Sequence, residues 1–425
     1  MNGAGKHGDV DDLAAVVPRE LLLYRIGPAK ADVKRDWKSA VTAALRTPIG
    51  MPPLEGTVSA GDKVVVLVDD VTRPTPQQAL LPPLFDSLNA AGVPDADITA
   101  IIALGTHRYM TQAEMQTRFG DEVLGRVHVI NHLWKDPDTF VDLGVTARRT
   151  PVKVNRTAYE ADLLIGVGTI VPHIYAGWGG GAKIVMPGIA CAEAIGPVHS
   201  LAADDGDFLR VAGRVGTLCR IEIERCAARV GLGFILNAVL DARGACAWVG
   251  AGEPALTHRA GIAAAEKIFV RDIPRRADIA IVDARPATID YWQGIKAIGH
   301  AARGVKKGGT IILVAEFPEG IETTHPDFAT HARHSEEEVI RAWEAGEITD
   351  SVAVAPLRLH ALAMDHCKVI CVSPGISAQD KEKIGFGHAE SVSEALDVAI
   401  AEHGRSAEVG VIVFGGDVVP RVSSS

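Results

Sequence analysis

A chain of 425 residues is longer than one hydrophobic core usually supports, so two domains are expected. Hydrophobic residues make up 47% of the chain and aromatic residues only 5%, which is typical of layered α/β proteins. The formal net charge of −10 argues against a general nucleic-acid-binding protein, but it leaves room for a local basic pocket that binds a small anion.

Cysteine usage and the first residues indicate a reduced cytoplasmic protein. The six cysteines include no CxxC pair, so most are expected to be small core residues. The opening residues lack the basic start and apolar run of a secretory signal, and no apolar run reaches membrane-spanning length. We therefore predict a cytoplasmic location without a membrane partner, and a mobile tail over residues 1–17.

The first half of the chain repeats a pattern of apolar strand, polar loop and helix. The runs VVVLVDD and ITAIIALG are continuous apolar stretches, which is typical of parallel strands buried on both faces. Pro74 and Pro76 delay the helix after the first run to about Gln77. Thr111 and Glu114 form a capping box that starts the helix after the second run. In chain order we expect an edge strand at 21–27, a helix at 36–47, strands at 64–70, 98–105, 127–132 and 161–170, and a β-hairpin across 230–252.

The second half begins after a charged segment that contains a proline, 271–278, which is predicted to link two domains. A strand at 279–284, a helix at 290–304 and a strand at 310–316 then form a βαβ unit, which is right-handed by default. The predicted fold class is α/β, with two domains of mostly parallel strands. Their expected bounds are 18–272 and 273–425, with further helices within 325–346, 354–366 and 391–404 and strands at 369–373 and 409–420.

Three of the predicted strands are followed by residues whose side chains can act in catalysis or bind a ligand. Asp70 and Arg73 follow one strand, His107 follows the next, and His173 and Lys183 follow a third. Open α/β sheets bind ligands at the carboxyl ends of their strands. We therefore predict that these side chains form one shared site.

The glycine run GWGGGAK lies within this predicted site. It fails the phosphate-loop pattern GxxxxGK[ST], because Ala182 and Ile184 stand where glycine and serine or threonine belong, so no ATP is implied. The run could still form a concavity of backbone N–H groups that holds an anion, with Lys183 at its edge. The alternative is a tight turn with a solvent-exposed lysine. The glycines concerned are Gly179, Gly180 and Gly181.

Spacing does not identify a metal site among the histidines. His107, His173 and His199 form no HxxxH or HExxH motif. His128 and His132 have the HxxxH spacing, but on a strand they would lie roughly 13 Å apart, too far to share one metal. Placement after strand ends makes His107 and His173 candidates for acid–base catalysis, whereas His199 is a weaker candidate.

Several neighbouring residues allow two interpretations. Arg73 beside Asp70 favours an anion-binding loop over a bare cation site. Arg108 either binds a carboxylate or only anchors its own loop. Gln293 and Lys296, three apart on one helix, either reach a ligand together or form a solvent-facing stripe. The aromatic residues beside them favour a covered cleft; they are Tyr291 and Trp292.

Four motifs together resemble the nickel-dependent lactate racemase family. They are DDVTRPTP, GTHR, PHIYAGWGGGAKIVMPGI with His199 downstream, and YWQGIKA. The resemblance covers roughly residues 20–420 in the same order and with similar spacing, and the combination is specific although each motif alone is not. It implies two α/β domains with the active site in the cleft between them. Domain 18–272 would carry the cofactor and the catalytic histidines, and domain 273–425 would close the cleft.

The resemblance also implies a cofactor, the nickel-pincer nucleotide. This pyridinium mononucleotide bears a thioamide and a thiocarboxylate, which hold nickel through a sulfur–carbon–sulfur arrangement. The thioamide would link to Lys183, His199 would be the fourth nickel ligand, and Asp70 would lie near the cofactor. Soft sulfur ligands with an imidazole suit nickel chemically.

The expected activity is that of an isomerase, a racemase or epimerase of a 2-hydroxy acid. The resemblance implies that His107 and His173 alternate as acid and base. One would take the hydroxyl proton while the C2 hydride moves to the cofactor, and the hydride would then return to the other face of a planar keto acid. The partners would be a small anionic substrate and, transiently, the cofactor-building enzymes, while a homo-oligomer stays open. The substrate-contacting positions would be Arg73, Gln293 and Lys296, with Tyr291 beside them.

Two segments depart from the pattern of the lactate enzyme. VAPLRLHALA, which contains Leu357, Arg358 and His360, stands where a pocket tryptophan is expected, and DDGDFLRVAGRVGTL follows His199 in place of a different glycine-rich segment. Both favour a larger or more acidic 2-hydroxy acid than lactate, and the roles of Arg358 and His360 stay open. Two alternatives remain: a redox enzyme or lyase on a related hydroxy acid, and a non-catalytic anion-binding homologue.

Overall fold

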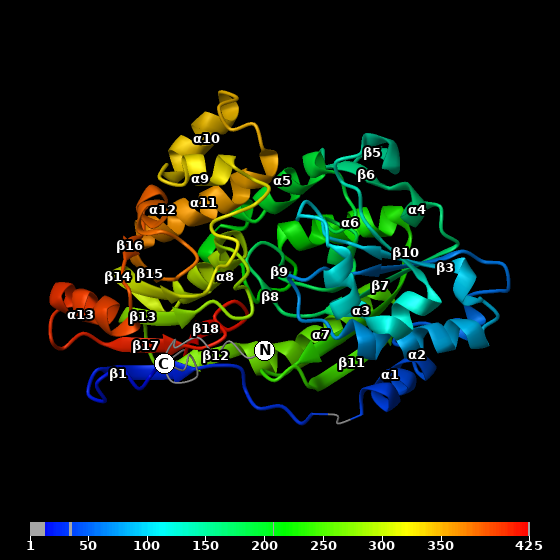
Figure 1. Cartoon of the computed structure of the whole chain (residues 1–425), viewed down its shortest axis with the longest axis horizontal. Coiled ribbons are helices and arrows are strands. Elements are labelled where there is room, and N and C mark those ends of the chain that lie inside the picture. Colours follow the sequence, from blue (N-terminus) through cyan, green and yellow to red (C-terminus); the bar gives the residue numbers. More distant parts are fainter. Residues whose placement is uncertain (1–12, 34–35, 207, 424–425) are drawn as a thin grey trace. The chain divides into compact units, whose positions relative to one another are not determined.

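The computed structural model describes residues 13–33, 36–206 and 208–423 (Figure 1). They divide into two compact units. Ala29–Ile268 with Asp350–Ala355 form the N-terminal unit, whereas the residues up to Pro28 with Phe269–Thr349 and Pro356–Ser425 form the C-terminal unit. Of the predicted tail at 1–17, residues 1–12 lie outside the described part. Leu13 and Val17 are buried in the core of the C-terminal unit.

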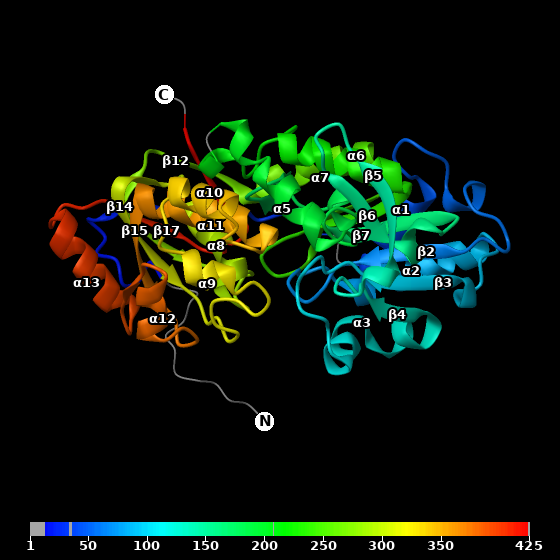
Figure 2. The ribbon, with the colours of Figure 1, turned by 90° about the horizontal axis from the view of Figure 1, so that it is seen from above.

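The N-terminal unit is built on a six-stranded sheet, part of which is labelled in Figure 2. Its strands are parallel except for one antiparallel pair, formed by the two strands of this sheet that come last in the sequence. The sheet order is β11 (Cys246–Gly252), β10 (Leu232–Leu240), β7 (Leu163–Thr169), β2 (Val64–Val68), β3 (Ile98–Ile102) and β4 (His128–Asn131). The helices are α1 (Trp37–Arg46), α2 (Gln77–Ala90), α3 (Gln112–Arg126), α4 (Arg156–Tyr159), α5 (Ala192–Ser200), α6 (Leu218–Val230) and α7 (Pro254–Phe269). Two small antiparallel pairs are β5 (Phe140–Val145) with β6 (Pro151–Asn155) and β8 (Pro172–His173) with β9 (Gly177–Trp178).

The centre of this sheet is apolar on both faces. Every residue of β2 is buried, and its β-branched side chains pack well on a pleated surface. Val66 and Val68 share a core cluster with Leu80 and Leu84 of α2. Because the centre of the sheet is filled in this way, chemically active residues can lie only where its strands end.

The C-terminal unit holds a second six-stranded sheet, which is parallel throughout. The first strand of the chain, β1, lies at one edge beside β17, close to the end of the chain (Figure 1). The sheet order is β1 (Leu22–Ile26), β17 (Val409–Ile412), β13 (Ala277–Asp283), β14 (Val305–Val314), β15 (Cys367–Val372) and β16 (Gly387–His388). The helices are α8 (Tyr291–Ala301), α9 (Asp327–His331), α10 (Glu336–Glu344), α12 (Ala378–Lys383), α13 (Val392–His403) and the part of α11 (Ser351–His366) that follows Ala355.

The predicted α/β class with largely parallel sheets is confirmed, and three local expectations are wrong. The segment predicted as a linker contributes β12 (Val270–Ile273), which pairs with β18 (Val419–Val422). The expected last strand is therefore two strands, β17 and β18. β14 begins at Val305, earlier than the strand expected from residue 310. Among the described residues, no helix combines the length and apolar character needed to cross a membrane.

Candidate active site

The loop after β2 holds Asp70 in a defined position. Thr72 donates to Asp70 Oδ1 from its backbone nitrogen at 3.1 Å and from its hydroxyl at 2.5 Å. Asp69 turns to other partners, pairing with Arg118 and accepting a hydrogen bond from Gln77 at 3.0 Å. Of the two adjacent carboxylates, Asp69 therefore anchors the loop and Asp70 is available to the predicted site.

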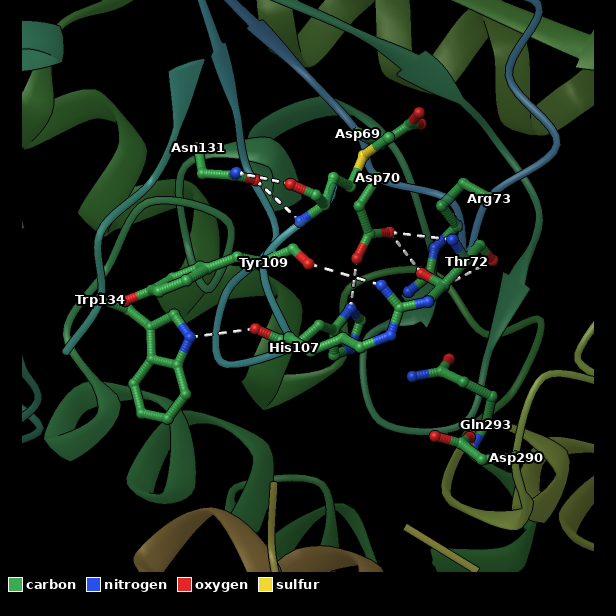
Figure 3. Close-up of polar contacts among 12 residues, drawn as sticks. Asp69, Asp70, Thr72, Arg73, His107, Tyr109, Asn131, Trp134, Asp290 and Gln293 are labelled. Carbon is green, nitrogen blue, oxygen red and sulfur yellow. Dashed lines mark hydrogen bonds and ion pairs between the residues drawn. The ribbon is translucent and has the colours of Figure 1, made fainter. Parts of the chain in front are cut away.

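His107, at the end of β3, is oriented by Asp70. Its Nδ1 lies 2.7 Å from Asp70 Oδ2, and Trp134 Nε1 donates to the backbone oxygen of His107 at 3.0 Å (Figure 3). Burial opposes ionisation of Asp70, but the charge and hydrogen bond of His107 lower its pKa below the usual range. An ionised carboxylate only accepts hydrogen bonds, so Nδ1 of His107 carries the proton. Nε2 of the neutral ring is then the proton acceptor.

His173 shows the opposite tautomer. It lies in β8 just beyond β7, and its Nδ1 accepts hydrogen bonds from the backbone nitrogens of Tyr175 and Ala176, both at 3.2 Å. The neutral ring must therefore carry its proton on Nε2. The two predicted acid–base residues thus differ: His107 offers a lone pair and His173 offers an N–H.

His199 lies in the last turn of α5. Its Nε2 is buried and has no hydrogen-bond partner among the described residues. Its ring centroid lies 4.7 Å from that of Tyr175 and 6.1 Å from that of His173. Burial and then the charge of Lys183 hold the pKa of His199 well below its ordinary value. A neutral imidazole with an unused buried nitrogen is well suited to ligate a metal.

In the glycine run, the contacts explain the glycines by close packing rather than by anion binding. The backbone nitrogen of Gly179 donates to Val171 at 2.7 Å, and that of Gly181 donates to the side chain of Asn237 at 2.8 Å, so neither is directed at a ligand. Gly180 and Gly181 have φ values of +71° and +58°, and a Cβ on either would come within 2.8 Å of a neighbouring atom. Glycine is therefore required here by conformation and by space. Contact of these glycines with a cofactor stays a prediction.

Lys183 follows this run in a short 3₁₀ turn, Gly181–Ile184, and is partly buried. Within the described residues, no hydrogen bond reaches its Nζ. Burial, followed by the charge of Arg73, lowers the pKa of Lys183 to about 7. A large fraction of the amine is therefore neutral near pH 7, which is the nucleophilic form.

The other cations named from the sequence have clear partners. Arg73 donates to the backbone and hydroxyl oxygens of Thr72 at 3.1 and 2.9 Å. Arg108 makes two hydrogen bonds to Glu114, at 3.0 and 2.7 Å, so it anchors its own loop. The capping box of α3, which uses Thr111 and the same glutamate, is confirmed. Arg358 pairs with Glu336.

The candidates on α8 lie in the C-terminal unit. Lys296 Nζ donates to Gln293 Oε1 at 2.6 Å, so these side chains do act together. Tyr291 is fully buried, and its hydroxyl donates to His360 Nδ1 at 2.7 Å, because His360 Nε2 already donates to the backbone oxygen of Ile384. This arrangement favours a role for Tyr291 in fixing α8 over direct contact with a substrate. Substrate contact by any of the three stays a prediction.

Sequence reasoning missed three side chains that hold the glycine run. Arg220 of α6 donates to the backbone oxygens of Trp178 and Gly180, and His258 of α7 donates to that of Gly179 at 2.8 Å. Asn237 of β10 accepts a hydrogen bond from the backbone nitrogen of Gly181. An asparagine inside the apolar strand GFILNAVL was a usable signal. The sequence contains no such signal for Arg220, because arginines on amphipathic helices are usually solvated.

The α/β fold, the Asp70–His107 contact and a lysine with a lowered pKa are the features against which the comparisons are set. The chain matches the family models described as the lactate racemase N-terminal domain, over residues 10–208, and C-terminal domain, over residues 274–419. It is 30% identical over 397 residues to the lactate racemase of Lactiplantibacillus plantarum, with 90% of each chain covered. It is 27% identical over 428 residues to the lactate racemase of Thermoanaerobacterium thermosaccharolyticum, with 94% of this chain and 92% of the relative covered.

Solved structures share the fold. The lactate racemase apoprotein from Thermoanaerobacterium thermosaccharolyticum superposes with a TM-score of 0.84 at 24% identity, over 95% of this chain and 96% of that one. A protein from Thermotoga maritima superposes with a TM-score of 0.72 at 19% identity, over 91% and 97%. The chain belongs to the lactate racemase family and is an enzyme of the isomerase class, as its motifs predicted.

Proposed function

We propose that this protein is a racemase or epimerase of a small 2-hydroxy acid. The observation that carries the proposal is the pair of histidines in opposite tautomers, His107 with a lone pair on Nε2 and His173 with a proton there. Inverting a carbinol centre requires a base that takes the hydroxyl proton and returns it after inversion, and a hydrogen-bond donor at the oxygen assists this step. Membership in the lactate racemase family supports the same conclusion.

The residues present fit the nickel-pincer nucleotide that the family resemblance implies. His199 has a buried ring nitrogen without a partner among the described residues, which suits a metal ligand. Lys183 has a largely neutral amine near pH 7, which suits a covalent link. Among the described residues, no three histidine, cysteine or acidic side chains gather as a metal site, so the other nickel ligands would come from the nucleotide itself. When bound, this cofactor would supply the hydride acceptor and donor.

The chain's own residues would handle the protons and the charge. His107 Nε2 takes the hydroxyl proton, and Asp70 stabilises the resulting imidazolium through Nδ1–H. His173 donates a hydrogen bond from Nε2–H to the substrate oxygen, and the imidazolium of His107 returns the proton. For the mirror-image substrate His173 takes the proton, for which its Nε2 must first have released its own. Arg73 and Lys296, with Gln293, hold the carboxylate and polarise the substrate oxygen.

The test is the stereochemical outcome. Protein co-expressed with cofactor-building enzymes is incubated with single enantiomers of a panel of 2-hydroxy acids, including lactate and larger or more acidic members. Chiral chromatography should show the same equilibrium mixture from either enantiomer of one member. Accumulation of a keto acid or an alkene would instead indicate a redox enzyme or a lyase, and loaded protein without turnover would indicate a binding homologue.

Two further properties belong to this proposal. A cytoplasmic location fits six cysteines that are all buried. The partners would be the small anionic substrate and, transiently, the cofactor-building enzymes, with no nucleic acid or membrane; a homo-oligomer stays open.

A further inference from the structure

Arg220 is a buried cation without a carboxylate partner. It is 4% exposed on α6, and its guanidinium donates to the backbone oxygens of Trp178 and of Gly180, the latter at 3.3 Å. Its Nε is buried and has no hydrogen-bond partner among the described residues, where no carboxylate lies within ion-pair distance of it. Burying an unpaired guanidinium costs desolvation free energy. A functional role would explain why an arginine occupies this position.

The two carbonyls that Arg220 binds belong to the glycine run, which is also held from other elements. Asn237 of β10 accepts from Gly181, and His258 of α7 donates to Gly179. Three buried polar side chains from three separate elements therefore fix consecutive peptide groups. Lys183 follows within the same 3₁₀ turn, so its position depends on this clamp.

Arg220 also acts on Lys183 electrostatically. Burial is the largest effect that disfavours the ammonium form of Lys183, and the charges of Arg73 and Arg220 add to it. The charges of Cys219 and Asp70 act in the opposite direction and favour the ammonium form. The charged and titratable groups that face the amine are Arg73, Cys219, Arg220 and Asp70.

We propose that Arg220 is a positioning residue for Lys183: its guanidinium holds the carbonyls of Trp178 and Gly180, and so fixes the turn that carries the lysine. With the turn fixed, the nitrogen lone pair is in place to form a covalent bond. The inference deepens the proposed function, because the partner in that bond would be the nucleotide cofactor.

The first test needs no cofactor. The full-length apoprotein is labelled with trace acetic anhydride between pH 5 and pH 11, and acetylation of Lys183 is followed by peptide mass spectrometry. Each event forms an N–C bond and releases acetate and a proton. The wild-type protein should show a midpoint near pH 7. Arg220→Gln should raise this midpoint by about one pH unit, because a like charge has been removed.

A matched control lies on the same helix. Arg225 pairs with Glu222 at 3.6 Å, and its side chain is 55% exposed, so Arg225→Gln should leave the Lys183 midpoint unchanged. An unchanged midpoint in folded Arg220→Gln would overturn the inference. If that variant fails to fold, Arg220→Lys is used to test the inference instead. It keeps the charge, so its midpoint should stay below about pH 8. A midpoint in the ordinary lysine range would contradict the proposal.

A second measurement separates this inference from the proposed function. After co-expression with the cofactor-building enzymes, Arg220→Gln should carry several-fold less covalent adduct on Lys183 than the wild type or Arg225→Gln. Equal loading of the three proteins would contradict the inference. Absence of any adduct on the wild-type protein would count against the cofactor, while the acetylation profiles would still decide the role of Arg220.

Discussion

Asp70 and His107 act as one unit, although they follow different strands. The carboxylate fixes the ring and assigns the proton to Nδ1 at a distance of 2.7 Å. This contact makes Nε2 the basic nitrogen. The chemistry of His107 is therefore decided by a residue 37 positions earlier in the chain.

We predict that Asp70→Asn lowers kcat of the loaded enzyme by about 10²- to 10⁴-fold, with a smaller effect on KM. The amide can donate to Nδ1, which would leave the proton on Nε2 and remove the base. Initial rates from single enantiomers provide the measurement. Asp86→Asn is the control, because that carboxylate is 55% exposed on α2 and pairs with Arg126. A loss of less than threefold for Asp70→Asn would show that the carboxylate does not set the tautomer.

For single residues, the sequence indicated which residue types belong to the predicted site but not which of their atoms carry protons. His107, His173 and Lys183 were predicted as site residues because parallel strands end at a common edge, and their roles stay predictions. The tautomers follow from single contacts, such as the Tyr175 nitrogen on His173, which no spacing rule encodes. The clamp by Arg220 was missed for the same reason, since it depends on how α6 packs.

The glycine run illustrates how one element can be misinterpreted from its composition. Its glycines suggested an anion-binding concavity, but the amides of Gly179 and Gly181 have acceptors within the protein. What requires glycine is the left-handed backbone and the lack of space for a Cβ. Composition alone does not distinguish these causes.

Gly180 and Gly216 allow the two causes to be separated, because both have φ of +71°. A Cβ on Gly180 would meet Thr169 O and an Ile170 side-chain carbon at 2.8 Å, whereas nothing lies within 4 Å of one on Gly216. Gly216→Ala should cost about 1–2 kcal/mol of unfolding free energy from backbone strain alone. Gly180→Ala should cost roughly 1–3 kcal/mol more, from overpacking. Urea unfolding measures both, and equal losses would contradict the packing argument.

Element boundaries were predictable where local chemistry sets them. The capping box at Thr111 and the start of α2 at Gln77 follow from nearby residues and are confirmed. The segment at 271–278 looked like a linker because it is charged and contains a proline. It nevertheless forms β12, because β18, close to the end of the chain, supplies its hydrogen-bonding partner. Pairing across such a separation leaves no local signal.

On the scale of the whole molecule, four buried histidines that lie outside the predicted acid–base and metal-ligand positions couple the stability of the fold to pH. Burial lowers the pKa of His132 and His360 to about 4 and that of His258 and His300 to about 3. Two lie in each unit. An unfolded histidine has a pKa near 6.5, so the unfolded chain binds these protons first as the pH falls. The stabilisation from keeping the rings neutral is complete above pH 6.5 and is lost as the pH falls toward 3.

We predict that the free energy of unfolding falls steeply between pH 6.5 and pH 4, by about 1.4 kcal/mol per pH unit for each proton taken up on unfolding. His258→Gln, which retains a donor for Gly179, should reduce this slope by roughly one proton. His128→Gln, at an exposed position, should leave it unchanged. Urea titrations at several pH values give the slopes; identical slopes for His258→Gln and the wild type would contradict the assignment.

The edge strand β1 has a consequence for how the protein is made. Among the described residues its partner in the sheet is β17, which is synthesised on the order of tens of seconds after β1. Through that interval the sheet of the C-terminal unit cannot be completed. A fragment that starts at 273 would also expose β17 as an open edge, which invites aggregation. Expression of the C-terminal unit alone should therefore require residues 13–28 to be supplied, by circular permutation or as a separate peptide.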